Sequence, residues 1–177
     1  MEHFDRVASR YAWIMSLPPV RWASNVERAT LTHLLADHDW RGVALIDVGA
    51  GIGGWHAYYR ERGVTTIIAV DRSRAMLIRC DARSLRVVAD ACALPFRDRA
   101  CDIATLIGVL NYVADALEWL AELHRVARRE VVWSVTRRGF AGKLYQLAKS
   151  AQRVRIHLRI APRQDDLGLT HFTIERA

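Results

Sequence analysis

The residues best placed to do chemistry follow apolar runs at three successive points of the chain. A glycine-rich turn begins at Gly49, and single aspartates, Asp71 and Asp90, end the next two apolar runs. Glycine lets a backbone turn tightly and approach a ligand, and a carboxylate accepts hydrogen bonds from ribose hydroxyls or a base amine. The turn alone is weak evidence, because Gly49 to Gly54 is one of many turns with the spacing GxGxxG. The three features together predict a nucleotide-like ligand, and the alternative is that Asp71 and Asp90 only cap helices.

Apolar runs rich in branched residues alternate with helical patterns along most of the chain. Such runs are typical of parallel strands that are covered on both faces. The alternation predicts a Rossmann-like, doubly wound α/β sheet of about seven strands, mostly parallel with an antiparallel edge pair. The strands are expected at 43–48, 65–70, 85–90, 102–108 and 130–135, with the edge pair at 153–160 and 170–176. Helices are expected from the glycine turn to 62, and over 73–82, 115–127 and 139–153.

The first 40 residues predict a helical cap in front of this sheet. A helical stripe covers 1–16, and Pro18 and Pro19 then break the pattern. A second helix is expected from Ser24 or Asn25 to Asp37. Its apolar face is expected to comprise Val26, Ala29, Leu34 and Leu35.

Length and charge limit the class of protein. The 177 residues, 51% of them hydrophobic, predict one domain over 1–177 and exclude a disordered chain. No long uncharged apolar run predicts a membrane span, and the charged N-terminus predicts a cytoplasmic protein. The net charge of +7 points to an anionic partner, but only the stretch 125–163 is densely basic. Three cysteines without CxxC spacing predict no metal site.

Six segments together resemble the class I S-adenosylmethionine-dependent methyltransferases, in particular the ubiquinone/menaquinone-type (type 11) branch. LIDVGAGIGG resembles the first motif of the family, and AVDRSRAML resembles its acidic strand end. ADACALPF, CDIATLIGVLNYVAD and ELHRVARR follow in the family's order, and FDRVASRY resembles the opening of that branch. The resemblance covers about residues 4 to 135. It implies S-adenosylmethionine as the cofactor.

The resemblance also implies roles for individual residues. Backbone of the glycine turn would contact the methionine part of the cofactor, and Asp47 is the leading acid of that motif. Asp71 would bind the ribose, with Arg72 beside the adenine, and Asp90 with Ala91 would read the adenine edge. The remaining expected cofactor contacts are Tyr11, Gly49, Ala50, Gly51 and Ile107.

The acceptor side resembles the family less closely. Ala12 stands where the family has an aspartate, the turn before the fifth strand is replaced by 128–131, and the usual cap over the acceptor is short or missing. No catalytic residue is defined. Tyr112 and His171 are candidates for polar groups near an acceptor, whereas His56 is expected to pack or to face solvent. Trp13, Trp22 and Trp55 are candidates to line a flat apolar pocket, or belong to the core.

Three functional hypotheses follow. The first is methyl transfer to a quinone-like, phenolic or other small-molecule acceptor by in-line displacement. The second is an RNA methyltransferase that uses the basic stretch 125–163, although a nucleic-acid partner is not favoured. The third is a non-catalytic subunit that keeps the fold, a hypothesis motivated by the shortened acceptor side. Such a subunit would work in a homodimer or with a partner subunit. A nicotinamide dehydrogenase is disfavoured, because 177 residues leave little room for a substrate domain.

Overall fold

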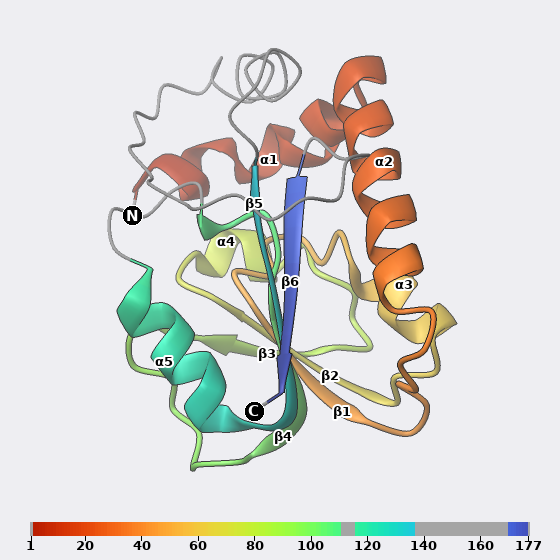
Figure 1. The fold of residues 1–177 in the computed structure, drawn as a ribbon. Helices are drawn as coiled ribbons and strands as arrows, with labels where there is room; N and C mark the ends of the chain where they lie inside the picture. The colour runs from red at the N-terminus through yellow and green to blue at the C-terminus, as the bar shows by residue number, and fades with distance from the viewer. Residues whose placement is uncertain (1, 111–115, 137–169, 177) are drawn as a thin grey trace.

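The computed structural model describes residues 2–110, 116–136 and 170–176, which form one α/β unit (Figure 1). Two helices open the chain, and strands then alternate with helices until β5. The helices are α1 (Glu2–Ser16), α2 (Pro18–Leu34), α3 (His56–Glu61), α4 (Arg74–Leu77) and α5 (Leu117–Val126). The strands are β1 (Ala44–Val48), β2 (Thr66–Asp71), β3 (Leu85–Val88), β4 (Cys101–Leu106), β5 (Ala127–Thr136) and β6 (Thr170–Arg176).

The described strands form one sheet in the order β3-β2-β1-β4-β5-β6. The first five strands of this order, β3, β2, β1, β4 and β5, run parallel to one another. Strand β6 runs antiparallel to β5, with Glu130 opposite Arg176. The expected edge segment 170–176 is therefore confirmed as antiparallel. Its expected partner 153–160 and the helix 139–153 lie outside the described residues, whose sheet has six strands instead of about seven. Strand order reverses between β1 and β4, which is where doubly wound sheets bind ligands.

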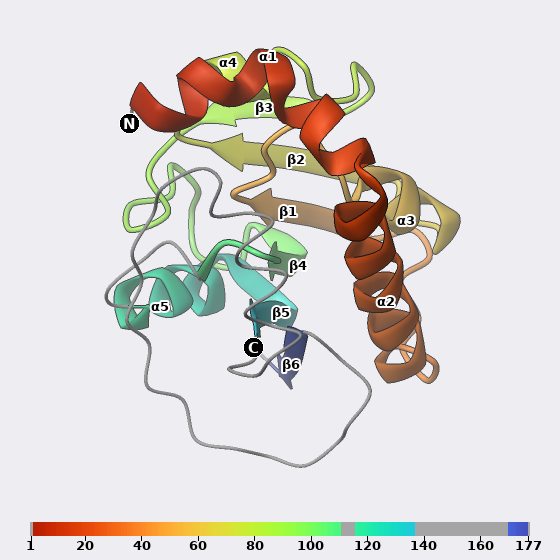
Figure 2. The same ribbon diagram turned by 90° about the horizontal axis from the view of Figure 1, so that it is seen from above.

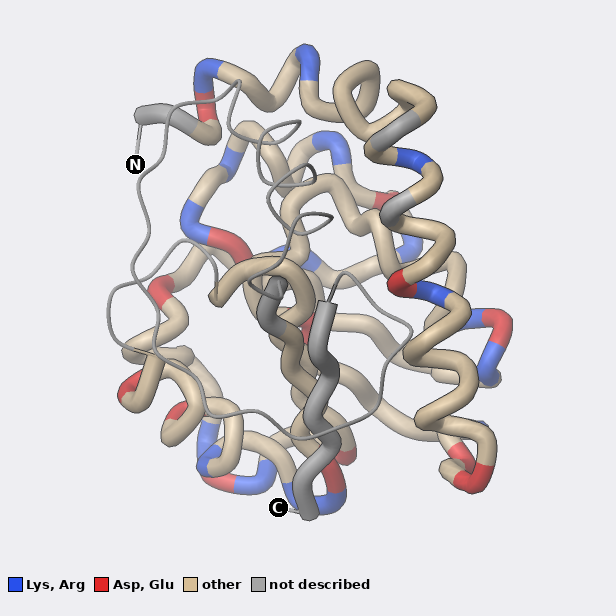
Figure 3. Tube along the Cα trace, turned by 45° about the horizontal axis from the view of Figure 1, so that its top comes forward, with Lys and Arg blue, Asp and Glu red and all other residues tan. Residues whose placement is uncertain are grey.

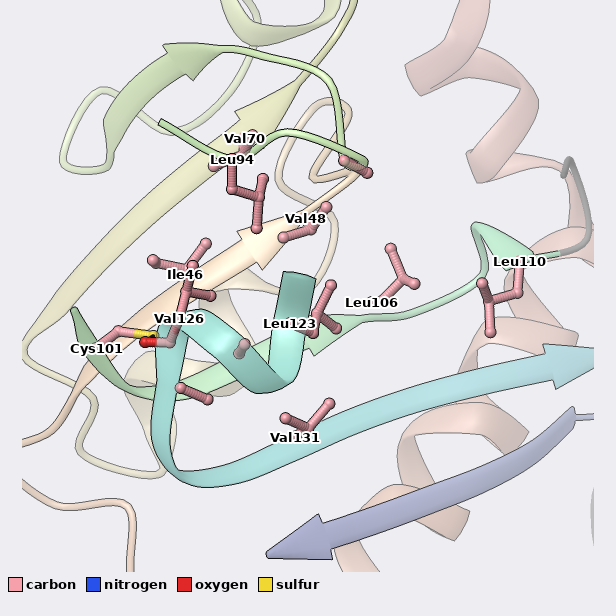
Figure 4. Packing of buried hydrophobic residues seen from close by; sticks show 13 residues of the cluster. Ile46, Val48, Val70, Leu94, Cys101, Leu106, Leu110, Leu123, Val126 and Val131 are labelled. Atoms are coloured by element: carbon pink, nitrogen blue, oxygen red, sulfur yellow. Dashed lines mark hydrogen bonds between the residues drawn. The ribbon is translucent and has the colours of Figure 1, made fainter. Parts of the chain in front are cut away.

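Both faces of the central strands are buried, which explains why β1, β2 and β4 are mostly apolar. One face packs against α5, with Leu123 and Val126 over Ile46 and Val131 (Figure 4). The other face packs against α2, α3 and α4, and Leu31 of α2 belongs to this second cluster. Seen from above, α1 lies beside α4 at the β3 edge of the sheet and continues into α2 (Figure 2).

The helix α2 begins six residues earlier than the sequence predicts. Pro18 occupies its first turn, where a missing N–H and a fixed φ are tolerated, so the prolines begin this helix instead of preceding it. Its buried stripe is also different from the predicted one. Leu34 is exposed, whereas the side chains that face inward are Val20, Ser24, Glu27, Leu31 and Leu35.

The helices after β1 and β2 are shorter than predicted. Residues 51–55 remain in turns, so α3 begins at His56 instead of within the glycine turn. Helix α4 is a single turn, and Ser73 caps it by accepting a hydrogen bond from the Met76 N–H at 3.2 Å. Long turns at the carboxyl ends of β1 and β2 leave backbone groups at this edge of the sheet.

Candidate functional site

The glycine turn places backbone at the switch point of the sheet. Gly49 and Gly51 have φ of +69° and +55°, values that side chains disfavour. A Cβ on Gly49 would lie 2.4 Å from Val109 Cγ2, so glycine is required there for packing. A Cβ on Gly51 would meet no atom within 4 Å, so its place is open space. The turn thus packs closely on one side and is open on the other.

Beneath the turn, Asp47 is held by a buried hydrogen-bond network. Thr105 Oγ1 donates to Asp47 Oδ1 at 2.8 Å, and His56 Nε2 lies 3.1 Å from Asp47 Oδ2. On its other side, His56 Nδ1 lies 2.9 Å from Ser84 Oγ. Burial by itself lowers the pKa of His56, but its hydrogen bonds to Asp47 and Cys80, together with the charge of the Asp47 carboxylate, outweigh burial and raise the pKa to about 9. The network therefore fixes the end of β1 with a buried ion pair.

Asp71 joins the end of β2 to the glycine turn. Its two carboxylate oxygens accept hydrogen bonds from the Gly51 N–H and the Ser73 N–H, each at 2.8 Å. Burial raises the pKa of Asp71, while these two N–H groups act in the opposite direction. Each oxygen has a further lone pair, so the carboxylate can also accept hydrogen bonds from a diol. Asp71 therefore binds the backbone just before α4, as the capping alternative predicts, and its carboxylate also has the acceptor capacity that a ribose contact needs.

One cavity of about 610 Å³ brings most of the predicted cofactor residues together. Its size falls within the range of small-molecule sites. Nine of the ten predicted residues line it: Tyr11, Asp47, Gly49, Ala50, Gly51, Asp71, Arg72, Ala91 and Ile107.

Asp90 is the predicted residue that does not line this cavity. Its Oδ1 accepts a hydrogen bond from the Cys92 N–H at 3.0 Å, and its Oδ2 lies 3.5 Å from Arg72 Nε. Its carboxylate thus stabilises the turn between β3 and β4, where no helix begins, so it does not cap a helix either. The neighbouring Ala91 lines the cavity instead.

Sequence reasoning missed a polar wall that α2 contributes to the same cavity. Ser24 and Glu27 lie on the buried stripe of α2, and Arg28 donates a hydrogen bond to the Gly54 carbonyl. The Arg28 guanidinium also stacks 5.2 Å from the centre of the Trp55 ring. The signal in the sequence is the spacing 20, 24, 27, 31 and 35, a helical stripe in which two members are polar.

The other candidate residues have varied positions. Tyr112 lies outside the described residues, and His171 belongs to β6, where its backbone pairs with Val135, although its side chain lies outside the described part. Trp55 lines the cavity, but Trp13 and Trp22 are 64% and 59% exposed and do not. They belong neither to the core nor to this pocket.

The described part of the basic stretch 125–163 lies at the amino ends of the strands, at the side of the sheet opposite the cavity. Arg125 pairs with Glu122 and Asp98, and Arg128 Nε lies 2.8 Å from Asp102 Oδ1. Basic and acidic residues lie beside one another there, near the end of β6 (Figure 3). These arginines follow α5 and begin β5, so they are at the amino ends of the strands, away from the cavity. No helix among the described residues is both long and apolar enough to span a membrane.

Comparisons with known proteins agree with this geometry. Residues 46–133 match the family model of a methyltransferase domain, type 11. A SAM-dependent methyltransferase, possible histamine N-methyltransferase, from Thermotoga maritima is 21% identical, with TM-score 0.65, over 85% of this chain and 69% of that one. Magnesium protoporphyrin IX methyltransferase from Synechocystis, solved with bound SAH, is 18% identical, with TM-score 0.63, over 81% and 72%.

A third solved structure is a Haloferax volcanii methyltransferase in complex with a methyltransferase activator. It is 23% identical, with TM-score 0.57, over 75% of this chain and 59% of that one. No protein with a curated description matches the sequence closely enough to count as a relative. The chain spans between 53% and 72% of the length of the solved structures compared first.

Fold, glycine turn and strand-end acid define a Rossmann-like domain that binds S-adenosylmethionine. Within that class, residues 46–133 carry the type 11 methyltransferase domain. The residues present fit the cofactor. The space beside Gly51 is open, the Asp71 carboxylate has acceptor capacity left, and the buried Ser24 hydroxyl at the cavity wall has no hydrogen-bond partner in the described part of the chain.

Proposed function

We propose that this chain transfers a methyl group from S-adenosylmethionine to a small-molecule acceptor. The observation that carries the proposal is that one cavity gathers the glycine turn of β1, Asp71 of β2 and Ile107 beyond β4. These positions come from the three adjacent strands at the switch point, where a doubly wound fold binds its ligand. A cytoplasmic location remains a prediction of the sequence.

The residues of the site would bind and orient the reactants. When bound, the cofactor supplies a methyl group on a sulfonium, which is open to in-line displacement. The glycine turn would hold the methionine part through its backbone, and Asp71 would hold the ribose. Phe4 and Tyr11 of α1, which also line the cavity, would exclude water from the reacting atoms. Alignment and exclusion of water are the main contributions that a protein makes to such a transfer.

Two observations favour a small acceptor over RNA. The cavity is walled by α1 and α2 as well as by the strand ends, which suits a compact ligand. Arg125 and Arg128 of the basic stretch are paired with carboxylates at the amino ends of the strands, so these two arginines do not form a groove beside the cavity. A quinone-like or phenolic metabolite agrees with the aromatic side chains at the wall.

Labelled methyl transfer tests this proposal directly. The full chain is incubated with methyl-labelled S-adenosylmethionine and, in separate reactions, with phenols, quinols and tRNA. We expect label on at least one small acceptor and none on tRNA. Label on tRNA alone would contradict the proposal, particularly if binding to tRNA weakens with rising salt as phosphate contacts require.

A non-catalytic or partner-dependent subunit is the second candidate. The Haloferax volcanii neighbour was solved with an activator, and the present chain spans 59% of that protein's length. Turnover by the purified chain alone, with any acceptor, would eliminate this candidate. A homodimer or partner subunit remains a prediction.

A further inference from the structure

The buried histidine His56 connects three parts of the chain beside the cavity. It is the first residue of α3 and is only 1% exposed. Its Nε2 lies 3.1 Å from Asp47 Oδ2 at the end of β1, and its Nδ1 lies 2.9 Å from Ser84 Oγ in the segment before β3. Its backbone N–H donates to the Gly53 carbonyl at 3.0 Å, and a Cβ on Gly53 would lie 2.8 Å from its Nδ1. The glycine turn therefore packs against the same ring that contacts Asp47.

A positive charge distinguishes His56 from a neutral hydrogen-bond donor. A side-chain amide can donate the same hydrogen bond to Asp47 Oδ2 without adding charge. Although burial lowers the pKa of His56, its hydrogen bonds to Asp47 and Cys80 and the charge of Asp47 raise it to about 9. The ring is therefore protonated at neutral pH, and its charge balances that of the Asp47 carboxylate.

One member of this pair reaches the cavity. Asp47 lines it, whereas His56 is not one of its lining residues. In a buried setting, where water screens little, a carboxylate acts on another charge across several ångströms. With His56 protonated, the pair as a whole is neutral toward a ligand in the cavity. Without that proton, the pair carries one negative charge.

A charge at this place distinguishes the cofactor from its product. S-adenosylmethionine carries a positive charge on its sulfur, and SAH does not. We propose that His56 is a positioning residue which, by balancing the charge of Asp47, sets how strongly the cavity prefers S-adenosylmethionine over SAH. A carboxylate that held the sulfonium too strongly would oppose methyl transfer, because the charge on sulfur is lost during the transfer. This inference rests on the proposed function and concerns the same cavity.

Other charged or titratable groups near the pair do not differ between the proteins that test the inference. Those in the described part of the chain are Tyr59, Arg60, Asp71, Cys80 and Asp81. Burial raises the pKa of Tyr59 well above its usual value, so its hydroxyl stays neutral near pH 9. Arg60 and Asp81 pair with each other at 3.5 Å. Any charge that these five side chains contribute is common to all the variants.

The ratio of the Kd for SAH to the Kd for S-adenosylmethionine tests the inference. Calorimetric titration at pH 7 measures it for the wild type, His56→Gln and the double variant Asp47→Asn/His56→Gln. A loosening of the fold that weakens both ligands equally cancels in this ratio. We expect the ratio to be at least about threefold higher in His56→Gln than in the wild type, because Asp47 then lacks its balancing charge. The double variant should return to the wild-type ratio, since neither charge is left.

A pH series on the wild type gives a second readout that needs no variant of the pair. Its ligands are 5′-methylthioadenosine and the S-methyl sulfonium of that compound, which lack the amino group of the cofactor. As the pH rises from 7 to 9.5, His56 loses its proton, and the preference for the sulfonium should increase. His33→Gln removes an exposed histidine of α2 outside the cavity and should behave like the wild type in both experiments.

Three results would overturn the inference. The first is an equal ratio in His56→Gln and the wild type, and the second is a double variant whose ratio stays as high as that of His56→Gln. The third is a wild-type preference for the sulfonium that does not change between pH 7 and pH 9.5. Failure of the wild type to bind either S-adenosylmethionine or SAH would instead refute the proposed function, so the two failures are distinguishable.

Discussion

At the scale of single residues, buried polar groups organise the site. Asp47 and His56 form an ion pair beneath the glycine turn, and Asp71 receives two backbone N–H groups. The positions of Asp47 and Asp71 could be predicted from the sequence, because each lies at the end of an apolar strand. Glu27 could not, since the sequence suggested a different phase for the stripe of α2. The buried side of a helix is hard to identify from the sequence when that side itself contains polar residues.

The His56–Asp47 pair predicts a pH dependence of stability. The pKa of His56 is about 9 in the folded chain, against 6.5 for an ordinary histidine, so folding favours the protonated form. The stabilisation is fully present below pH 6.5 and is lost as the pH rises through 9, with a total on the order of 3 kcal/mol. Urea unfolding at pH 6 and pH 9.5 measures the difference.

His56→Gln is the matched variant for this experiment. It should be less stable than the wild type at pH 6 and should show a flatter dependence between pH 6.5 and 9. Tyr59 and Cys80 also face this network and are unchanged in the variant. An equally steep loss of stability in His56→Gln would show that His56 is not its source.

At the scale of elements, turns at the carboxyl ends of the strands form the cavity more than the helices do. The sequence predicted the β1 turn and its ligand-facing role, because glycines followed a clear strand. It placed the start of α3 too early, since a glycine-rich turn does not show where a helix takes over. Helix α2 was also started too late, because prolines were taken as a break when they fit a first helical turn.

Substitutions of Gly51 and Gly42 are expected to lower the stability of the fold alike but to affect SAH binding differently. Gly51 and Gly42 both have positive φ, and a Cβ on either would meet no atom within 4 Å. Alanine at each position should therefore cost about 1–2 kcal/mol of stability through backbone strain alone. Only Gly51 lines the cavity, so only Gly51→Ala should weaken SAH binding. Thermal unfolding and calorimetry check the two effects.

The comparison between these variants is decisive because their strain is alike. Unchanged SAH affinity in both Gly51→Ala and Gly42→Ala would mean that the open side of the turn does not face the cofactor. A loss of SAH affinity in Gly42→Ala as large as in Gly51→Ala would mean that strain, and not occupancy of the cavity, governs binding.

At the scale of the whole molecule, the described residues form one Rossmann-like methyltransferase domain. One doubly wound sheet is covered on both faces, and the helices α1 and α2 precede it in the chain. That residues 1–40 serve as a cap stays a prediction. The central parallel strands could be predicted because burial on both faces makes β1, β2 and β4 mostly apolar. The net charge of +7 proved less informative, because Arg125 and Arg128 of the basic stretch are paired with acids away from the cavity.

The central claim is that the cavity at the switch point binds S-adenosylmethionine through Asp71. Calorimetric titration of SAH into the wild type, Asp71→Ala and Asp81→Ala tests it. Asp81 is a matched control, because it pairs with Arg60 and Arg83 and does not line the cavity. We predict that Asp71→Ala loses about 1.5–3 kcal/mol of binding free energy, roughly 10- to 150-fold in affinity, while Asp81→Ala binds like the wild type. Equal affinity in all three proteins, or no binding to the wild type, would contradict the claim.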